Sequence, residues 1–317
     1  MNQVLDNPFP FSDTNKRYHT FSYAMKKRYG QKLAKIPLNA NFTCPNRDGT
    51  KGVGGCAFCS TLGSGDSILA AQENLAIQYD QNLKRARQKW PQALGMAYFQ
   101  AFSNTYASLK VLQDLYTPFF EHPDVVALAI ATRADCLNEA TAAWLSAMQQ
   151  ATQKEVWLEF GLQTIHEKTA QAMHLCHTKE DLQEALALCK QYGLKSCVHI
   201  INGLPGEKAK DMLETAQFVA QVHPQAIKIH MLHLLNNSRL GQKWKLDPFE
   251  LLSLEQYVQI VVDQLEVLPP DMIIERVTGD GLVQDLLAPL WTIKKTVVAN
   301  DIDKELVRRQ SYQGLHY

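Results

Sequence analysis

Short apolar runs alternate with amphipathic stretches along the chain from residue 35 onward. Six of these runs have the length and the β-branched or aromatic content of buried strands. They are KIPLNAN at 35–41, LGMAYFQAF at 94–102, VVALAIA at 125–131, EVWLEFGL at 155–162, SCVHIIN at 196–202 and AIKIHML at 226–232. Apolar residues at helical spacing fill the intervals at 73–90, 107–120, 179–192 and 207–222. This alternation predicts an α/β fold in which helices cover the outer face of a parallel sheet.

The tail of the chain has a different pattern. Residues 249–267 predict one helix, which Pro269 and Pro270 interrupt. MIIERV at 272–277 predicts a further strand, and helical segments follow to the end. We expect the tail to close or extend the sheet instead of forming a separate domain.

Composition sets the broad class. A chain of 317 residues that is 46% hydrophobic can bury one substantial core. No run of eighteen apolar residues exists, so the sequence predicts no membrane span. The first residues lack the basic-then-apolar order of a signal peptide. Together with an odd number of cysteines, seven, this predicts reduced thiols and a cytoplasmic protein.

Charge is balanced overall but uneven along the chain. Lysine plus arginine equals aspartate plus glutamate at 32 each. Residues 1–51, however, hold nine basic and three acidic residues, interleaved with tyrosine, phenylalanine and histidine. Such a segment suits phosphates and stacked bases. The alternative is a solvated helix face packed on the barrel, and charge alone favours that alternative slightly.

The stretch NFTCPNRDGTKGVGGCAFCS at 41–60 carries the strongest chemical signal. Cys44, Cys56 and Cys59 form a C-x11-C-x2-C pattern on a glycine-rich loop, with no fourth cysteine or histidine nearby. Three thiolates suit a cubane iron–sulfur cluster that keeps one iron for an outside ligand. The alternatives are a structural zinc site with a distant fourth ligand, or ordinary thiols in a loop.

The third cysteine, the missing fourth ligand and Phe58 within C-x-F-C make this stretch resemble the radical S-adenosylmethionine (radical SAM) superfamily. There, three cysteines hold a [4Fe-4S] cluster whose open iron chelates the amino and carboxylate groups of SAM. The usual spacing is C-x3-C-x2-C, so the long first gap departs from it. That gap, and the lead-in RYHTFSYAMKKRYGQKLAKIPLNANFTCPNRDG, resemble the YhcC/YtqA-type branch, which is related to Elongator catalytic subunits.

The resemblance implies a partial (β/α)6 TIM-type barrel. We expect an N-terminal basic and aromatic extension at 1–34, the barrel at 35–248, and a C-terminal extension packed on it at 249–317. It also implies a [4Fe-4S] cluster on Cys44, Cys56 and Cys59, SAM, and an external electron donor such as flavodoxin or ferredoxin.

Polar residues follow the strands, where a barrel of this kind carries its reactive groups. After the second strand come Gln100, Ser103 and Asn104, at a position that often holds the methionine amino group in the superfamily. A turn or a helix N-cap is an equally natural role for Ser and Asn. The fourth strand carries Glu159 and Gln163, which resemble the E-x-G-x-Q signature of the Elongator-like branch and are expected to face the lumen and SAM.

The fifth strand delivers His199, Asn202 and Gly203, which resemble an element near the adenine of SAM, and Glu207 is expected to cap the next helix. The alternative is a plain strand-to-helix turn. After the third strand, Arg133 and Asp135 could contact substrate or pair with each other, and the residues alone favour the pair.

Three further residues are candidates for substrate binding or catalysis. Lys228 and His230 would share one face of the sixth strand, where two cations favour an anionic group. Arg276 ends the late strand beside Glu275, with Asp280 close behind. Arg276 could bind a carboxylate or pair with Glu275. The other cysteines, Cys136, Cys176, Cys189 and Cys197, lack cluster spacing and are expected to be core or half-buried thiols.

The leading hypothesis is an enzyme that makes a 5'-deoxyadenosyl radical and abstracts a hydrogen atom from an unactivated carbon. The Elongator relationship implies transfer RNA (tRNA) as partner and the C5 side chain of wobble uridine as target, converting carboxymethylaminomethyl-uridine to aminomethyl-uridine. A radical SAM enzyme acting on a small anionic metabolite is the second hypothesis. A metal- or cluster-binding interaction protein is the third.

Overall fold

Seven parallel strands form one curled sheet. The computed structural model describes residues 9, 14, 16–61, 63, 74–279 and 283–317. Each strand pairs in parallel with its neighbour in the order β1-β2-β3-β4-β5-β6-β8. The strands are β1 (Leu33–Leu38), β2 (Leu94–Phe99), β3 (Val125–Thr132), β4 (Glu155–Gln163), β5 (Lys195–Asn202), β6 (Ala226–Met231) and β8 (Ile273–Arg276). A second, antiparallel pair joins β7 (Leu234–Leu235) and β9 (Leu286–Ala288).

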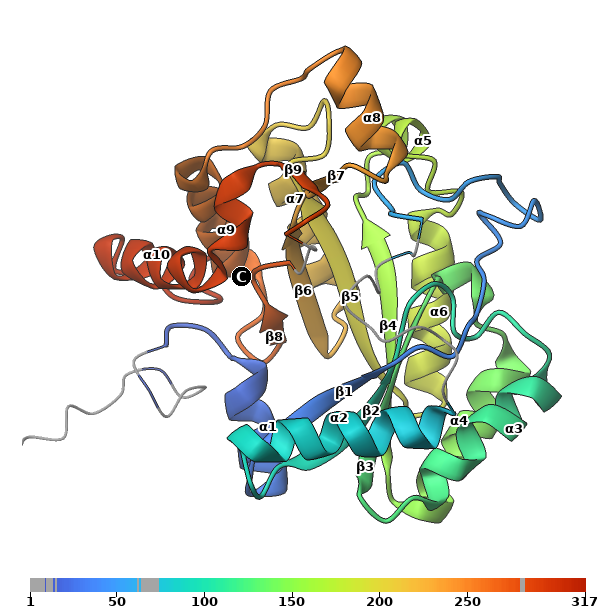
Figure 1. The fold of residues 1–317 in the computed structure, drawn as a ribbon. Helices are drawn as coiled ribbons and strands as arrows, with labels where there is room; N and C mark the ends of the chain where they lie inside the picture. The colour runs from blue at the N-terminus through green and yellow to red at the C-terminus, as the bar shows by residue number, and fades with distance from the viewer. Residues whose placement is uncertain (1–8, 10–13, 15, 62, 64–73, 280–282) are drawn as a thin grey trace, which may run out of the picture.

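Most helices follow a strand and cover the outer face of the sheet, while the first helix of the chain packs at the amino ends of the strands (Figure 1). They are α1 (Phe21–Tyr29), α2 (Leu75–Lys89), α3 (Leu109–Glu121), α4 (Glu139–Thr152), α5 (Glu167–Ala172), α6 (Lys179–Gln191), α7 (Ala209–Val222), α8 (Arg239–Leu246), α9 (Leu254–Val267) and α10 (Lys295–Arg308), with short 3-10 helices η1 (Ala134–Cys136) and η2 (Leu290–Ile293). None of the helices within the described ranges has the length and apolar character that a membrane span requires.

Alternating side chains divide the sheet into two faces. The outward residues form the large core beneath the helices, with Phe99, Tyr116 and Phe160 among its buried members. The inward residues line a lumen that changes character along its length. Nearest the amino ends of the strands lies an apolar layer, which we call the floor. It consists of Ala24, Met25, Leu33, Met96, Ala127, Ala129, Trp157, Cys197 and Ala226, with Tyr98 at its upper margin.

The N-terminal segment and the C-terminal tail fill the gap between the two edge strands. Thr20 forms a parallel bridge with Ile274 of β8, and α1 contacts both β1 and β8. The buried Gln313 joins the two segments, because its backbone N–H donates to the Arg17 carbonyl and its side-chain amide donates to the Met272 carbonyl at 2.8 Å. The tail therefore extends the barrel, as its sequence pattern predicts.

The six predicted strands are all present, within a few residues of their expected bounds. Asn138 caps α4, accepting from the Thr141 N–H at 2.9 Å. Glu207 does not cap α7: Lys208 is the N-cap, and the Glu207 carboxylate instead accepts from the Thr164 hydroxyl at 2.5 Å. The basic helix α1 packs on the barrel, which is the alternative that charge alone favoured.

Candidate active site

The cysteine loop lies at the carboxyl edge of the sheet, at the opposite end from α1 (Figure 1). Cys44 follows β1 and is buried, while Cys56 and Cys59 are half-buried. Loops from the other side of the edge hold this segment in place. The Ala57 N–H donates to the Met173 carbonyl at 2.9 Å, and the Ala57 carbonyl accepts from the Leu240 N–H at 2.8 Å. The loop is therefore fixed by backbone hydrogen bonds on two sides.

The three thiols fit a cluster better than a single ion. In a tetrahedral zinc site, with Zn–S bonds of about 2.3 Å, ligand sulfurs lie roughly 4 Å apart. Across the described residues, the one group of three or more ligand atoms lying within 4.8 Å of one another does not include these cysteines. A cubane places each cysteine on a different iron and so spaces the sulfurs more widely. The donor chemistry, three thiolates on one loop without a fourth protein ligand there, therefore favours a [4Fe-4S] cluster over structural zinc.

The surroundings of the loop favour a thiolate at Cys56. A hydrogen bond from the Cys59 thiol, together with Arg133, lowers the pKa of Cys56 to about 7 against the effect of burial. The same hydrogen bond, followed by burial, raises the pKa of Cys59 well above its usual value. The Asn46 side-chain amide also approaches the Cys56 Sγ at 3.5 Å. Negative charge on the sulfurs would therefore meet a guanidinium and an N–H donor.

Arg133 and Asp135 pair with each other, as the residues alone indicated. The pair is bidentate, at 2.9 and 2.8 Å, and Lys51 of the cysteine loop joins it at 2.7 Å. Arg133 also donates to the Leu175 carbonyl at 2.7 Å and to the Cys176 carbonyl at 2.8 Å. This pair thus connects the end of β3 to the cysteine loop and to the segment after α5.

Directly above the floor, four charged side chains meet inside the lumen; we call them the charged layer. Lys35 contacts both Glu159 and Glu275, the latter at 2.6 Å. Lys228 likewise contacts both carboxylates, Glu275 at 3.2 Å. Each ammonium also lies over the ring of Tyr98, within 5.0 Å of its centroid. The layer is balanced, with two cations and two carboxylates.

Burial and mutual attraction compete in the charged layer. Burial acts to raise the pKa of Glu159, but Lys228 and Lys35 outweigh it and hold the pKa well below its usual value. Burial acts to lower the pKa of Lys228, yet Glu159 and Glu275 raise it overall. Glu159, Lys35 and Lys228 therefore stay charged near neutral pH. A buried charge costs several kcal/mol unless it is paired, which explains the complete pairing.

Two histidines stand next to the charged layer, on the side facing the cysteine edge. The His199 Nε2 lies 3.1 Å from a Glu159 oxygen, so it carries the proton and donates. The His230 ring lies 5.4 Å from the His199 ring. Burial lowers the pKa of His199 to about 4, and burial followed by His199 and Arg276 lowers the pKa of His230 well below its usual value. Both imidazoles are therefore neutral at pH 7.

The predicted Lys228 and His230 pair shares the lumen face, but the two residues differ in kind. Lys228 is 3% exposed and bound by two carboxylates, so its charge is already compensated. Arg276, at the end of β8, is close enough to affect the pKa values of Tyr98 and His230. Asp280 lies outside the described residues.

The residues after β2 sit beside the cysteine loop. The Gln100 N–H donates to the Leu38 carbonyl at 3.0 Å, and the Ser103 N–H donates to the Thr43 carbonyl, next to Cys44, at 3.2 Å. The Asn104 side-chain amide donates to the Ala101 and Ala131 carbonyls, both at 2.8 Å. Ser103 Oγ and Asn104 Oδ1 are buried without a hydrogen-bond partner among the described residues. Such unpaired acceptors fit a site that takes a polar ligand.

The remaining residues predicted to bind SAM lie at the ends of β4 and β5, and their side chains are on different faces of the sheet. Gln163 has a φ of 70° and folds back over Gly161, so that it shares a face with Glu159. Gly203 turns the chain after β5 with a φ of 90°. Asn202 points to the outer face, where it exchanges hydrogen bonds of 2.8 and 2.9 Å with Gln264 of α9. The Asn202 side chain therefore holds α9 against the sheet.

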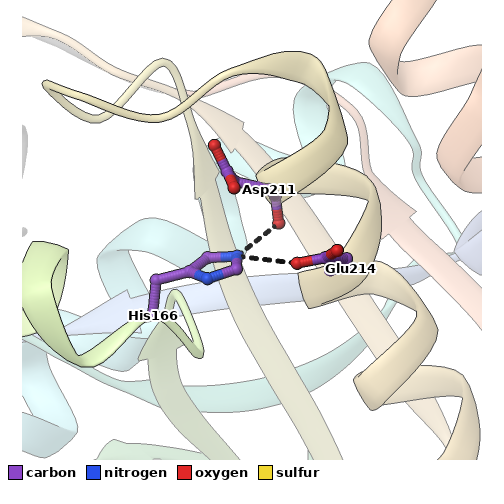
Figure 2. Close-up of side chains that lie close together, drawn as sticks. All are labelled: His166, Asp211 and Glu214. Carbon is purple, nitrogen blue, oxygen red and sulfur yellow. Dashed lines mark hydrogen bonds and ion pairs between the residues drawn. The ribbon is translucent and has the colours of Figure 1, made fainter.

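His166, Asp211 and Glu214 lie close enough together to be considered as a metal site, but their contacts within the protein do not favour one (Figure 2). The His166 Nε2 lies 2.8 Å from the Asp211 backbone carbonyl, which can only accept, so this nitrogen carries the proton. The Asp211 carboxylate accepts from the Lys208 N–H at 2.7 Å as part of the α7 capping box. These contacts explain the cluster as helix capping and packing.

Some functional residues escape sequence reasoning. Lys35 and Tyr98 complete the lumen network, although neither is among the predicted site residues. A lysine at an inward position of an otherwise apolar strand is the signal that could have found Lys35. Cys189 and Cys197 are buried and Cys136 is half-buried as expected, but Cys176 is exposed, against expectation.

Family models match most of the described barrel. The model for the radical SAM superfamily matches residues 49–219, and that for a radical SAM C-terminal domain matches residues 224–308. YtqA of Bacillus subtilis, an uncharacterized protein, is 43% identical over 98% of this chain and 96% of its own length. YhcC of Escherichia coli is 34% identical over 92% of this chain and 93% of its own.

More distant similarity reaches the Elongator group. A tRNA uridine(34) acetyltransferase of Methanocaldococcus jannaschii is 27% identical over 49% of this chain, which corresponds to 28% of that protein. The structure of Elp3 from Methanocaldococcus infernus superposes with a TM-score of 0.65 at 15% identity, covering 89% of this chain and 64% of that one. The latter likeness concerns the fold.

Proposed function

This chain belongs to the radical SAM superfamily, and from that premise we propose that it modifies the C5 side chain of wobble uridine in tRNA, converting carboxymethylaminomethyl-uridine to aminomethyl-uridine. Enzymes of the family use a [4Fe-4S] cluster and SAM together with an electron donor. The cluster, when bound, supplies the electron that cleaves SAM and releases a 5'-deoxyadenosyl radical. Cys44, Cys56 and Cys59 would hold the cluster. Abstraction of a hydrogen atom from the carboxymethyl CH2, return of one electron to the cluster and addition of water would break the C–N bond, releasing the two carbons as glyoxylate and leaving the amine on the uridine.

The observation that carries the proposal is the set of polar groups in the lumen above the charged layer. The neutral His199 and His230 lie there, and Arg276 at the end of β8 is close to His230 and Tyr98. An imidazole N–H or a guanidinium can donate hydrogen bonds to a substrate carboxylate. The carboxymethyl group of the modified uridine supplies such a carboxylate.

Each predicted catalytic residue receives a role in this proposal. Arg276 binds the substrate carboxylate, and His230 lines the same space as a neutral hydrogen-bonding group. Lys228 acts through Glu159, whose carboxylate orients His199, so that Lys228 is a positioning residue. Ser103, Asn104, Gln163 and Gln100 line the space between the lumen and the cysteine loop, where SAM would bind.

The choice of tRNA rests on similarity to a protein named as a tRNA uridine(34) acetyltransferase, over about half of this chain. The chain corresponds to 28% of that relative, so the acetyl transfer is not carried over. What the proposal takes from the relative is the nucleoside, a modified uridine at the wobble position.

The test is an anaerobic reaction with an internal control. The protein is reconstituted with iron and sulfide, then incubated with SAM, dithionite and tRNA from cells that lack this modification step. The 5'-deoxyadenosine is quantified, and the tRNA nucleosides are analysed by mass spectrometry. We expect 5'-deoxyadenosine together with loss of the carboxymethyl mass from wobble uridine, and neither product from a Cys56→Ala variant.

Two other results would overturn parts of the proposal. If 5'-deoxyadenosine forms while the tRNA is unchanged, radical chemistry stands and the substrate is a different molecule, with a small anionic metabolite next in line. If an intact cluster yields no 5'-deoxyadenosine, the enzyme activity itself is wrong.

A further inference from the structure

A cavity opens at the end of the barrel opposite the cysteine loop. It has a volume of about 460 Å³ and lies between α1 and the amino ends of β4, β5, β6 and β8. Met25 of α1, Trp157 of β4, Lys195 of β5 and Ile273 of β8 line it. Figure 1 shows α1 at this end, away from the loop after β1. Cavities of about 300–1,000 Å³ are typical of small-ligand sites. We call this cavity the floor pocket.

The rim of the floor pocket is strongly basic. Lys27, Arg28 and Lys195 line it, with Asp271 as the one carboxylate of the lining. Arg28 pairs with Glu155, outside the pocket. The ammonium groups of Lys27 and Lys195, by contrast, have no hydrogen-bond or ion-pair partner among the described residues. Two ammonium groups therefore converge on one concave surface without a carboxylate to neutralise them.

Both imidazoles of the pocket contact Asp271, the residue that carries its single carboxylate. The His223 Nε2 lies 3.3 Å from Asp271 Oδ1, and the His19 Nδ1 lies 3.1 Å from the Asp271 backbone carbonyl. Asp271 is thereby held at the rim next to histidines. The two lysines remain the groups that an incoming anion would meet.

The inner wall of the floor pocket is apolar and aromatic. Trp157 is 2% exposed, Met25 is 2% exposed and Met272 is 1% exposed, and all three contribute to the lining. The Trp157 indole nitrogen has no hydrogen-bond partner among the described residues. A cationic rim above an apolar wall suits a ligand with an anionic end and a flat apolar body.

Positive charge continues outward from the pocket on the same end of the barrel. Lys32, just before β1, and Lys89, the last residue of α2, both lie over the Trp90 ring, at 5.1 and 4.7 Å from its centroid. Because the helices of a βα unit end where the next strand begins, Lys89 shares this face with Lys27. Basic residues around an exposed aromatic ring are typical of surfaces that bind nucleic acid.

We propose that the floor pocket binds a phosphate-bearing nucleotide, either free or as one residue of an RNA chain. The phosphate meets Lys27 and Lys195, and the base lies against the apolar wall formed by Trp157 and Met25. This site lies at the far end of the lumen from the cysteines, so its ligand is not the group on which the radical acts. The RNA source rests on the proposed function, whereas the free-nucleotide source does not.

The test compares two double variants of the full chain. Lys27→Ala with Lys195→Ala removes both rim ammonium groups. Lys110→Ala with Lys304→Ala removes two exposed lysines elsewhere, 78% and 76% exposed, as a matched charge control. Binding of AMP is measured by calorimetry, and binding of a labelled anticodon stem-loop RNA by fluorescence anisotropy. Thermal unfolding shows that each variant is folded. Formation of 5'-deoxyadenosine from SAM and dithionite, without RNA, shows that the reconstituted variant still cleaves SAM.

We expect the rim variant to bind about tenfold more weakly and the control variant to match the wild type. Weaker binding of RNA alone supports the pocket with an RNA residue as ligand, and weaker binding of AMP alone supports it with a free nucleotide. Equal binding by the rim variant and the wild type, or an equal loss in the control variant, would overturn the proposal. Because 5'-deoxyadenosine and the uridine product are measured separately, a failure here does not imply a failure of the proposed function.

Discussion

The floor and the charged layer are neighbours within one lumen, yet they are built on opposite principles. The floor buries Leu33, Met96 and Trp157 against α1 and contains no ion pair among its described members. The charged layer buries Lys228 and Glu159 just above it. Apolar burial stabilises a fold, whereas buried ion pairs are often no better for stability than apolar residues of the same size. The contrast indicates that the charged layer serves a ligand, whereas floor residues outside the floor pocket, such as Leu33 and Met96, serve the fold.

Removal of a cluster cysteine should have the largest effect, because it should abolish activity and leave the stability of the fold almost unchanged. Cys56→Ala leaves two thiols for the cluster, so we expect 5'-deoxyadenosine formation to fall at least about a hundredfold, while stability of the cluster-free protein changes little. Iron content, the visible absorption of the reconstituted protein and product yield measure this. Cys189→Ala, in the outer core, is the control. Full activity in Cys56→Ala would contradict the assignment of the cysteines.

Breaking the charged layer should cost stability and turnover together. Glu159→Gln removes one of the two carboxylates that hold Lys35 and Lys228, so we expect a loss of about 4 kcal/mol in the free energy of unfolding. Urea denaturation measures it. Asp114→Asn breaks the exposed Lys110–Asp114 pair and should cost less than about 0.5 kcal/mol. Equal effects of the two substitutions would show that burial does not matter here.

A floor substitution should affect stability alone. Leu33→Ala removes a side chain that is 2% exposed and should cost about 3 kcal/mol in unfolding free energy. The yield of 5'-deoxyadenosine per folded molecule should stay at the wild-type level, because the floor is remote from the cysteine loop. If Leu33→Ala lowered the specific activity as much as a cysteine substitution does, the prediction that the floor affects stability alone would be contradicted.

The smallest effect concerns pH. Burial lowers the pKa of His199 and of His233 from 6.5 to about 4. At a pH between these two pKa values, the unfolded chain binds protons that the folded chain does not. The cluster-free protein should therefore lose stability as the pH falls from 7 to 5, by about 2 kcal/mol for each histidine. Urea denaturation across this range checks it. His199→Asn should flatten the dependence, and an unchanged slope would show that His199 is not held neutral by the fold.

Sequence periodicity predicts the strands well and the lumen only in part. The apolar runs place all six barrel strands, and alternation places Glu159 and Lys228 on the inward face. Periodicity cannot say which inward groups meet across the lumen, because that depends on how the sheet curls. Lys35 is therefore found only in the structure, and so is the contact of Glu275 with both lysines. A motif match likewise says nothing about Gln264, the partner of Asn202 on α9.

For the cysteine loop, the chemistry can be predicted from the sequence, whereas the contacts that support the loop cannot. Its pattern predicts the cofactor from a single stretch, since all three ligands lie within 41–60. What holds the loop is spread over Asp135, Met173 and Leu240, three separate segments of the chain. Local chemistry is readable from sequence where one segment supplies it, and support from distant segments is not.

The central claim is that the lumen above the charged layer is where a radical meets a modified uridine. Transfer of a labelled hydrogen tests it most directly. The reconstituted protein would be given SAM, a reductant and tRNA that carries deuterium in the carboxymethyl group of its wobble uridine. We predict that the resulting 5'-deoxyadenosine contains deuterium and that the nucleoside loses its carboxymethyl mass. Unlabelled 5'-deoxyadenosine with an unchanged nucleoside would contradict the claim.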